Sequence, residues 1–319
     1  AARLNEARFF DLVLVDDFSR PDKIANHEGV KCAAKVDRAD FIDWLAENES
    51  QVQFIFHLGA RTDTTEQNKA IFDELNEAYS QQIWNACVAY GLPLVYASSA
   101  ATYGGGEHGY RDDHACVERL QPLNPYGVSK NNFDQWALAQ AEEGNAPYFW
   151  TGLKFFNVFG PNEFHKGRMA SVVFHTFNQV NATGAMKLFR SHREDYVDGG
   201  QTRDFVYVKD LVDVCLFLMH HRLPASNGLY NLGTGEARTF LDLARATFAA
   251  MDKEPNISFI DTPEDIRDTY QYFTEADMSK LRSIGYDQPF RSLEDAIEDY
   301  VKNHLTPGLH WKARQETPQ

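Results

Sequence analysis

The stretch FDLVLVDDFSR, residues 10–20, decides the fold class of the chain. It is an apolar run that stops at two acids, Asp16 and Asp17, as the second strand of a dinucleotide-binding unit does. In such a unit the acid takes the ribose hydroxyls of the cofactor, about 20 residues after a glycine-rich turn. Only 15 residues precede Asp16, and the first glycine is Gly29. The stretch therefore predicts a second strand without showing a first one.

Strands and helices alternate through the following 140 residues or so. Apolar runs predict strands at 30–36, 52–60, 92–99 and 148–161, and helical spacing predicts helices at 37–48, 65–91 and 124–144. This alternation predicts an α/β fold with a doubly wound parallel sheet. Such sheets bind ligands beyond the carboxyl ends of their strands, where Asp16, Gly59, Ser99 and Asn157 fall.

The alternation breaks after Pro161 and returns at Arg203. We predict a dinucleotide-binding domain made of 1–157, 203–233 and 272–289. A smaller α/β substrate domain would comprise 158–202, 234–271 and 290–319. Residues 162–202 show no strong strands, a last helix is expected at 292–305, and the tail 306–319 is expected to be loosely ordered.

The composition excludes several classes of function. A formal net charge of −15 argues against a nucleic-acid partner, and no apolar run reaches the ~18 residues of a membrane span. The histidines lack the spacing of metal ligands, so we predict no metal site. Four cysteines are widely spaced, as in proteins of the reducing cytoplasm, where we expect this protein to work: Cys32, Cys87, Cys116 and Cys215.

The segment PYGVSK, 125–130, places Tyr126 and Lys130 four residues apart on one face of a helix. A free phenol has a pKa of about 10, and a lysine cation held close to it favours the phenolate. A tyrosine so placed can act as a general base. Tyrosine and lysine also occur at this spacing on solvated helix surfaces, so the pair alone does not decide the function.

A second motif precedes this pair. YASSAATYG, 96–104, ends a predicted parallel strand with hydroxyls at Ser98, Ser99 and Thr102. A hydroxyl there can bond both the tyrosine oxygen and a sugar oxygen that is being oxidised, although a polar strand end can also simply cap a loop. The order of strand-end serine, helical Y-x-x-x-K and FFNVFGP (155–161) is much rarer than either motif alone.

With RDFVYVKDLVD (203–213) and YNLGTGE (230–236) added, the chain resembles the extended short-chain dehydrogenase/reductase family of nucleotide-sugar epimerases and dehydratases over nearly its whole length. More specific segments are YASSAATYGG (96–105), FNVFGPNEFHKGRMASVVFH (156–175), KLF (187–189) and YQYFTEADMSKLRSIGYDQPF (270–290). These are similar to the branch that inverts C6 of an ADP-linked heptose for lipopolysaccharide cores. The resemblance implies an ADP-heptose substrate and, because relatives assemble as rings of five, a homo-oligomer.

The resemblance also implies roles for single residues. Tyr126 would be one acid/base residue, Ser99 its hydrogen-bonding helper, and Lys130 the residue that holds the nicotinamide ribose and lowers the tyrosine pKa. Lys166, in the H-K-G segment, would be a second base. Two bases suit an epimerase, which takes hydride from one face of a carbon and returns it to the other.

Two further sets of residues follow from the resemblance. The implied substrate site contains Ser99, Asn157, Arg168, His175, Phe189, Arg203 and Tyr270. Arg203 suits a diphosphate because a guanidinium can bond two phosphate oxygens, but it could instead be a surface arginine paired with Asp204. Arg168 stands where relatives often carry a small residue. The implied cofactor site contains Asp16, Asp17, Lys23, Arg38, Leu58, Gly59, Ala60, Asn76, Lys130 and Val158.

The acidic and basic residues of the implied cofactor site give opposite indications about whether the cofactor is NADP or NAD. Asp16 suits a ribose with free hydroxyls, and Asp17, where relatives usually have asparagine, would repel a 2′-phosphate. Lys23 and Arg38 match positions where relatives hold basic side chains near that phosphate. We predict NADP, with NAD as the alternative.

In the family, AARLNEARFF (1–10) would be the end of a first helix, so the first strand and the glycine-rich turn would precede Ala1. A turn that binds pyrophosphate is hard to replace, and loss of the first, central strand would leave two strands with unpaired edges. We therefore expect roughly 15–20 further residues before Ala1.

Two alternative functions remain open. The chain could be another nucleotide-sugar epimerase, such as a UDP-hexose 4-epimerase, or a dehydratase of the same family. A dehydratase normally has Thr-Asp-Glu after the strand, and SSAATYGG (98–105) has no acid. The chain could also be a non-catalytic dinucleotide-sensing module, but such a module has no need of intact Ser99, Tyr126 and Lys130.

Overall fold

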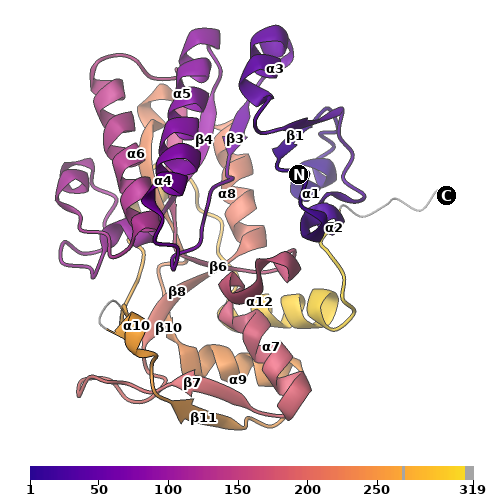
Figure 1. Ribbon diagram of the computed structural model, residues 1–319, viewed down its shortest axis with the longest axis vertical. Helices are drawn as coiled ribbons and strands as arrows, with labels where there is room; N and C mark the ends of the chain where they lie inside the picture. The colour runs from indigo at the N-terminus through magenta and orange to yellow at the C-terminus, as the bar shows by residue number, and fades with distance from the viewer. Residues whose placement is uncertain (268–269, 313–319) are drawn as a thin grey trace.

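The computed structural model describes residues 1–267 and 270–312. The half at the top of Figure 1 is built on parallel strands. β1 (Val13–Asp16) pairs with β2 (Ala34–Asp37), and a four-stranded sheet has the order β3-β4-β5-β9. Its strands are β3 (Ile55–His57), β4 (Leu94–Ser99), β5 (Trp150–Phe155) and β9 (Gly228–Leu232). The predicted α/β fold with a parallel sheet is confirmed.

Among the described residues, no strand lies hydrogen-bonded between β1 and β3. β1 pairs only with β2, and β3 pairs only with β4, so each of them has one edge without a partner strand. The sequence led us to expect two such edges. The further residues expected before Ala1 stay a prediction.

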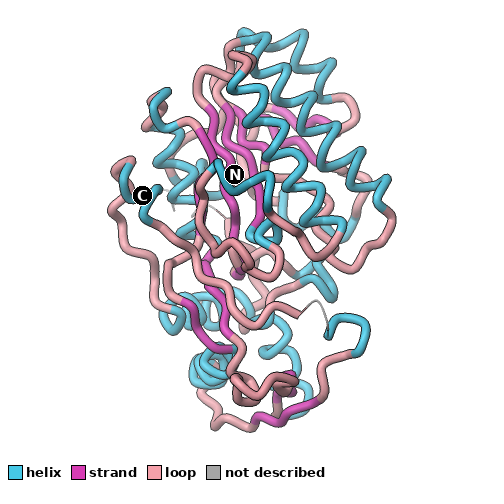
Figure 2. Tube along the Cα trace, turned by 90° about the vertical axis from the view of Figure 1, so that its left-hand side faces the viewer, coloured by secondary structure: helices cyan, strands magenta, loops and turns pink. Residues whose placement is uncertain are grey.

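Helices cover both faces of the four-stranded sheet (Figure 2). Successive strand residues point to opposite faces, so Leu94 and Tyr96 join one core and Val95 joins another. The first core also contains residues of α3 (Phe41–Asn48), α5 (Tyr79–Tyr90) and α6 (Pro125–Glu142). The second contains residues of α8 (Val208–His220) and α11 (Ser279–Ser283).

Local signals set the ends of these helices. The Asn124 side-chain oxygen accepts the Gly127 N–H at 2.8 Å, and Pro125 takes the first helical position of α6. α5 ends at Gly91, whose φ of 64° is left-handed. The helix predicted at 65–91 starts later, at Lys69, because Asn68 caps it, and it is divided into three parts. Its parts are α4 (Lys69–Phe72), a π-helical turn (Asp73–Ala78) and α5.

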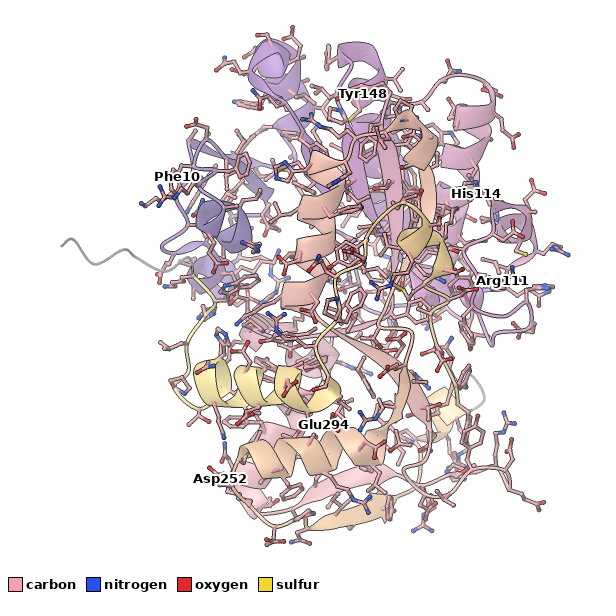
Figure 3. All side chains as sticks on the ribbon, turned by 180° about the vertical axis from the view of Figure 1, so that it is seen from behind. Phe10, Arg111, His114, Tyr148, Asp252 and Glu294 are labelled. Atoms are coloured by element: carbon pink, nitrogen blue, oxygen red, sulfur yellow. The ribbon has the colours of Figure 1, made fainter. Side chains whose placement is uncertain are left out.

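The lower half of Figure 1 holds the remaining strands and three longer helices. β6 (Asn157–Phe159), β8 (Thr202–Tyr207) and β10 (Ala237–Thr239) form one sheet, and β7 (Met186–Phe189) pairs with β11 (Ile257–Ile260). The helices are α7 (Val172–Thr183), α9 (Phe240–Ala250) and α12 (Leu293–Tyr300). Figure 3 labels Asp252 and Glu294 here, whereas Phe10, His114 and Tyr148 lie in the sheet-bearing half.

The region 162–202 is more regular than the sequence indicated. It contains α7 and the strand β7, where we expected no strong strands. The Ser171 hydroxyl caps α7, and Gly184, with a φ of 72°, ends it. β7 was missed because it is short and alternates buried with more exposed residues over only four positions.

The C-terminal segment contacts other parts of the fold. Ser292 caps α12, which continues as a π-helical turn at Val301–Leu305. The expectation of a loose tail is wrong for its first part, because the Trp311 N–H donates to the Asn162 side chain at 2.7 Å and its indole donates to Glu6 at 2.9 Å. Residues 313–319 lie outside the described residues.

The remaining α-helices among the described residues are short: α1 (Ala2–Glu6), α2 (Ile24–His27) and α10 (Glu264–Arg267). None of the helices formed by residues 1–267 and 270–312 has the length and apolar character that a membrane crossing requires. The four cysteines are free thiols.

Candidate active site

Tyr126 and Ser99 meet where α6 begins and β4 ends. A hydrogen bond with the Ser99 side chain lowers the pKa of Tyr126, but burial acts in the opposite direction and is the larger effect. The pKa of Tyr126 in the ligand-free protein is therefore above its usual value. The structure brings the two predicted residues together.

Lys130 lies one turn further along α6 and is buried. Its ammonium group donates to the carbonyl oxygen of Ala97 at 2.7 Å. Burial lowers the pKa of Lys130 to about 8, against an opposing effect of Asp134. Lys130 is not among the groups that act on the pKa of Tyr126, so the expected depression of that pKa is absent in the ligand-free protein. Desolvation of the phenol outweighs its hydrogen bond with Ser99, and the ammonium group of Lys130 is directed at the strand backbone.

Asn76 connects the loop after β3 to the same helix. It is 1 % exposed, accepts the Arg61 N–H at 2.8 Å, and donates to the Arg61 carbonyl and the Ser129 hydroxyl at 3.0 Å each. Asn76 lies in the π-helical turn, a feature often found at functional sites. The adjoining loop presents Leu58, Gly59 and Ala60, and open space surrounds the position of a Cβ at Gly59.

The acidic and basic side chains predicted for the cofactor site form two ion pairs near the end of β1. Lys23 Nζ donates to Asp16 Oδ1 at 2.6 Å, and Arg38 Nη2 lies 3.6 Å from Asp17 Oδ2. A hydrogen bond from Ser19 lowers the pKa of Asp17. Close by, the side-chain oxygen of Asn26 and Nε2 of His27 are buried without a hydrogen-bond partner. Nε2 of His27 lies 3.5 Å from Asp16 Oδ2. The unpartnered oxygen of Asn26 and the half-buried acids at the strand end fit a polar ligand such as a dinucleotide.

Lys166 lies on an exposed turn, Phe164–Met169. Gly167 has a φ of 53° there, which gives the turn a kink. The ring nitrogen Nε2 of His175 lies 3.2 Å from the Arg168 carbonyl. Hydrogen bonds from Thr65 are the main cause that lowers the pKa of Asp63 in the loop after β3, and the charge of Arg168 adds a smaller effect in the same direction. In the described part of the chain, Lys166 makes no hydrogen bond or ion pair with Tyr126.

Both ends of this turn are fixed by residues that the sequence did not single out. The buried carboxylate of Glu163 accepts the Ser171 N–H at 2.8 Å, the Ser171 hydroxyl at 2.6 Å and the Tyr300 hydroxyl at 2.8 Å. The Asn26 side chain meets Nδ1 of His165 at 3.0 Å. The turn is therefore held by α7, by the last helix and by the segment after β1.

Arg203, Phe189 and Tyr270 form the predicted aromatic and basic cluster. Arg203 is 6 % exposed, and its guanidinium carbon lies 5.4 Å from the Tyr270 ring centroid and 5.6 Å from that of Phe240. The Phe189 and Tyr270 rings are 6.0 Å apart. Burial lowers the pKa of Arg203.

Asp204 does not pair with Arg203, which removes the alternative interpretation of that arginine. Its carboxylate accepts the backbone N–H groups of Thr234 at 2.7 Å, Gly235 at 2.9 Å and Ala276 at 3.0 Å. Arg203 instead donates to the carbonyl oxygens of Thr202 and Gln271. No carboxylate among the described residues is within ion-pair distance of Arg203, so its charge is available to an anionic ligand.

β6 carries Asn157, which is exposed, and Val158, which lies opposite Val206 of β8. The Gln271 amide donates to the Gly104 carbonyl, which joins the segment that carries Tyr270 to the loop after Ser99. Gly104 has a φ of 61°, and a Cβ there would lie 1.9 Å from the Gln121 carbonyl oxygen. Only glycine fits this junction.

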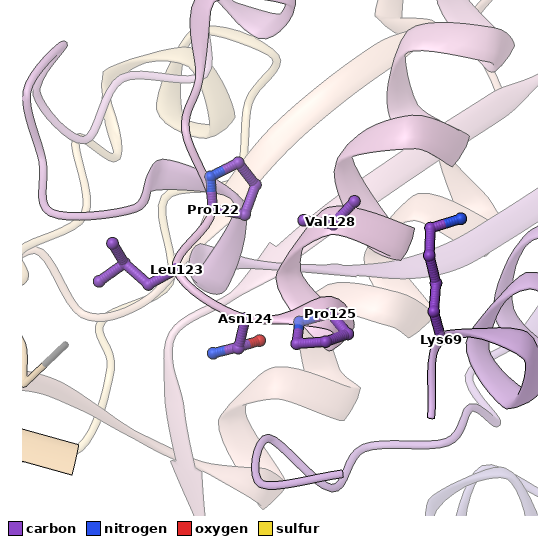
Figure 4. Close-up of a pocket in the computed structure, with 6 residues that line it drawn as sticks. All are labelled: Lys69, Pro122, Leu123, Asn124, Pro125 and Val128. Carbon is purple, nitrogen blue, oxygen red and sulfur yellow. The ribbon is translucent and has the colours of Figure 1, made fainter. Parts of the chain in front are cut away.

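A shallow pocket of about 260 Å³ lies beside the start of α6 (Figure 4). Its lining residues are Lys69, Pro122, Leu123, Asn124, Pro125 and Val128. None of them belongs to the predicted sites. Among the described residues, no three histidines, cysteines or acids are grouped so that they could hold a metal ion.

Comparison with known proteins identifies the family. The model of the NAD dependent epimerase/dehydratase family matches residues 1–233. ADP-L-glycero-D-manno-heptose-6-epimerases from Fusobacterium nucleatum and Nitratidesulfovibrio vulgaris are each 45 % identical to the chain, over 313 and 306 residues, and each match covers 95 % of this chain and 93 % of the relative.

Solved structures share the fold. The ADP-L-glycero-D-manno-heptose-6-epimerase of Helicobacter pylori superposes with a TM-score of 0.76 at 24 % identity, over 95 % of this chain and 92 % of the other. The UDP-glucose 4-epimerase of Thermotoga maritima gives 0.73 at 21 %, over 94 % and 92 %. The family match over most of the chain and the two relatives lead to one conclusion. The chain belongs to the NAD dependent epimerase/dehydratase family.

Proposed function

We propose that the protein is an ADP-glycero-manno-heptose 6-epimerase that supplies heptose for lipopolysaccharide cores. The observation that carries the proposal is the meeting of Ser99, Tyr126 and Lys130 at the end of β4, in a chain whose 45 % identical relatives are named for this activity. The buried, unpaired charge of Arg203 beside two aromatic rings supports a nucleotide diphosphate as the anchoring group of the substrate.

The cofactor that we propose is NADP. When bound, such a cofactor would supply reversible hydride transfer at the sugar. Lys23 and Arg38 place two cations at the end of β1, which favours a 2′-phosphate, while Asp16 and Asp17 partly offset them and keep NAD as the alternative. Leu58, Gly59, Ala60, Asn76, Lys130 and Val158 complete the proposed cofactor site.

The protein side chains move the protons. C6 of the heptose is not next to a carbonyl, so its hydrogen is not acidic, and oxidation of the C6 hydroxyl is the more accessible route. Tyr126 would take the hydroxyl proton while Ser99 bonds the same oxygen. Lys166 would serve the opposite face of the transient ketone, and Asn157, Arg168, His175, Phe189 and Tyr270 would line the sugar and nucleotide site.

The proposal also includes a domain division, a location in the cell and an oligomeric state. The dinucleotide-binding domain would comprise 1–157, 203–233 and 272–289, and the substrate domain 158–202, 234–271 and 290–319. By these boundaries β8, which lies in the lower half of Figure 1, would belong almost wholly to the dinucleotide-binding domain. The protein would work in the cytoplasm, where its four free cysteines stay reduced. It would form a homo-oligomer, with a ring of five implied by the family resemblance.

Direct assay tests the proposal. Purified protein is incubated with ADP-D-glycero-D-manno-heptose, inversion at C6 is followed by NMR, and the retained cofactor is identified by mass spectrometry. We expect inversion, a cofactor with the extra phosphate of NADP, and loss of activity in Tyr126→Phe with the cofactor still bound. Interconversion of UDP-glucose and UDP-galactose without action on the heptose would reject the proposal in favour of a 4-epimerase.

A further inference from the structure

A buried ion pair lies next to the candidate active site and takes no part in the chemistry described above. Lys154 Nζ and Asp134 Oδ2 are 2.7 Å apart, and their side chains are 1 % and 0 % exposed. Burial of two charges is costly, and a hydrophobic pair of similar volume often serves stability as well. Stability alone is therefore a weak reason for a charge pair at this place.

The pair joins three elements at one point. Lys154 of β5 is the register partner of Ser98 of β4, and both side chains donate to the same carboxylate oxygen of Asp134 on α6. The Ser98 hydroxyl does so at 2.6 Å, and the Tyr96 hydroxyl donates to the other carboxylate oxygen at 3.0 Å. One carboxylate thus fixes two strands to the helix.

The strand end that carries Ser99 is bonded to this pair. Lys154 Nζ also donates to the Thr102 hydroxyl at 2.8 Å, and that hydroxyl donates to the Ser99 carbonyl at 2.8 Å. The backbone of Ser99 is therefore connected to Asp134 through two side chains.

The helix that carries the other reactive groups is connected in the same way. Asp134 follows Tyr126 by eight residues and Lys130 by four, so the three share one face of α6. Lys130 in turn holds the Ala97 carbonyl of β4 at 2.7 Å. Displacement of Asp134 would shift the helix face and the strand end relative to each other.

We propose that Asp134 and Lys154 are positioning residues for the reaction, a buried charge pair that holds Ser99 against Tyr126 and balances the charge around Lys130. The proposal rests on the acid/base function proposed for Tyr126. The two residues touch neither sugar nor cofactor in this assignment and act through their neighbours.

The electrostatics agree with the geometry. Burial is the largest effect on both groups, lowering the pKa of Lys130 and raising that of Tyr126, and the negative charge of Asp134 contributes an upward effect on each of the two pKa values. Lys154, in contact with the same carboxylate, opposes that charge. Removal of Asp134 alone should therefore lower the pKa of Tyr126, and removal of Lys154 alone should raise it.

Other titratable groups around Lys130 do not change their charge near neutral pH. Burial, helped by the charge of Lys130, lowers the pKa of His57 at the end of β3 to about 3, so that ring is neutral. Burial also raises the pKa of Tyr96 and of Tyr103 well above their usual values. Tyr103 lies beneath Lys154, whose Nζ is 5.2 Å from its ring centroid.

The test uses the purified holoenzyme and three variants, Asp134→Asn, Lys154→Met and the double variant Asp134→Leu/Lys154→Met. The pKa of Tyr126 is followed by NMR of ¹³Cζ-labelled tyrosine, with Tyr126→Phe to assign its signal. We expect that pKa to fall by about one unit in Asp134→Asn and to rise by about one unit in Lys154→Met. In the double variant the two charge effects cancel, and the pKa of Tyr126 should stay within a few tenths of a unit of its wild-type value.

Activity separates positioning from charge. In the double variant we expect kcat to fall by about tenfold to a hundredfold, because a small misplacement of reacting groups has that effect, while KM for the sugar changes by less than about twofold. The control is Asp210→Asn on α8, which breaks the pair between the buried Asp210 carboxylate and the exposed guanidinium of Arg291 and should leave kcat and the Tyr126 titration unchanged.

The outcomes test the positioning claim and the charge claim separately. A folded double variant with retained cofactor and wild-type kcat overturns the positioning claim, and an unchanged Tyr126 titration in both single variants overturns the charge claim. Where a single variant fails to fold, the double variant, which leaves no unpaired charge, decides. If the wild type does not act on the heptose, the proposed function fails, whereas the NMR titration still tests the pair.

Discussion

At the scale of single residues, the candidate site depends on how close β5 lets the Tyr96 ring approach. Gly152 is the register partner of Tyr96, and the tyrosine ring lies over it on the way to Asp134. A Cβ at Gly152 would lie 2.4 Å from Cζ of that ring and 2.7 Å from a methyl carbon of Leu229. The glycine therefore makes room for the side chain that helps to hold the buried pair.

We predict that Gly152→Ala destabilises the fold by about 1–3 kcal/mol, the range for overpacking of a core. Tyr96 cannot retreat without losing its hydrogen bond to Asp134. Urea unfolding measures the effect. Gly59→Ala is the matched control, because nothing lies within 4 Å of its Cβ position, and it should change stability by less than about 0.5 kcal/mol. Equal effects of the two substitutions would contradict the packing argument.

At the scale of elements, the turn that carries Lys166 is a segment clamped between helices. Glu163 before the turn accepts three hydrogen bonds, two from Ser171 at the start of α7 and one from Tyr300 at the end of α12. The side chain of Lys166 itself is exposed. The position of this proposed base therefore depends on Glu163 rather than on contacts of its own.

Replacement of Glu163 tests that dependence. Glu163→Gln turns an amide N–H₂ toward one of the donors, so we expect kcat to fall by about tenfold with little change in KM, and Tyr300→Phe to cost less because it removes one donor of three. In a Lys166→Ala background, Glu163→Gln should cause no further loss of kcat, since the two act through one group. Independent, multiplicative losses would argue that Glu163 serves the fold alone.

Another element-scale contact predicts a pH dependence of stability. Burial tends to raise the pKa of Asp299 on α12, but hydrogen bonds from Lys209, Asn303 and Tyr207 outweigh it and lower that pKa from 3.8 to about 2. The carboxyl group of Asp299 therefore binds its proton less tightly in the folded state than in the unfolded state. The resulting stability is present above about pH 4 and is lost as pH falls toward 2.

We predict that Asp299→Asn lowers the free energy of unfolding by about 1–2 kcal/mol at pH 7. The gap to the wild type should close as pH falls from 4 to 2. Urea unfolding across this pH range measures it, with Glu298→Gln, which breaks an exposed pair with Lys302, as the control. A gap that is constant with pH would contradict the assignment.

At the scale of the whole molecule, local patterns predicted the fold class, and the family resemblance supplied most residues of the candidate site. Helical spacing singled out Tyr126 and Lys130, and the strand end offered Ser98, Ser99 and Thr102, of which the family resemblance selected Ser99. Asp134 continues the same four-residue stripe, and Lys154 is a lysine within the apolar run WTGLKFF (150–156), so both left a signal that we did not use. The pairing of Asn162 with Trp311 joins residues 149 apart and leaves no local pattern, as is usual for contacts between distant segments.

The last prediction concerns the path of one hydrogen atom and needs both halves of the molecule. The sheet-bearing half supplies Tyr126, and the lower half supplies the turn with Lys166 and the anchoring Arg203. If the diphosphate stays anchored while the ketone turns between the two bases, the hydride taken from C6 returns to C6 without meeting water. The reaction run in deuterium oxide should therefore give a product without deuterium at C6, as read by NMR and mass spectrometry. Substantial deuterium there would reject hydride return, and with it the roles of Tyr126 and Lys166.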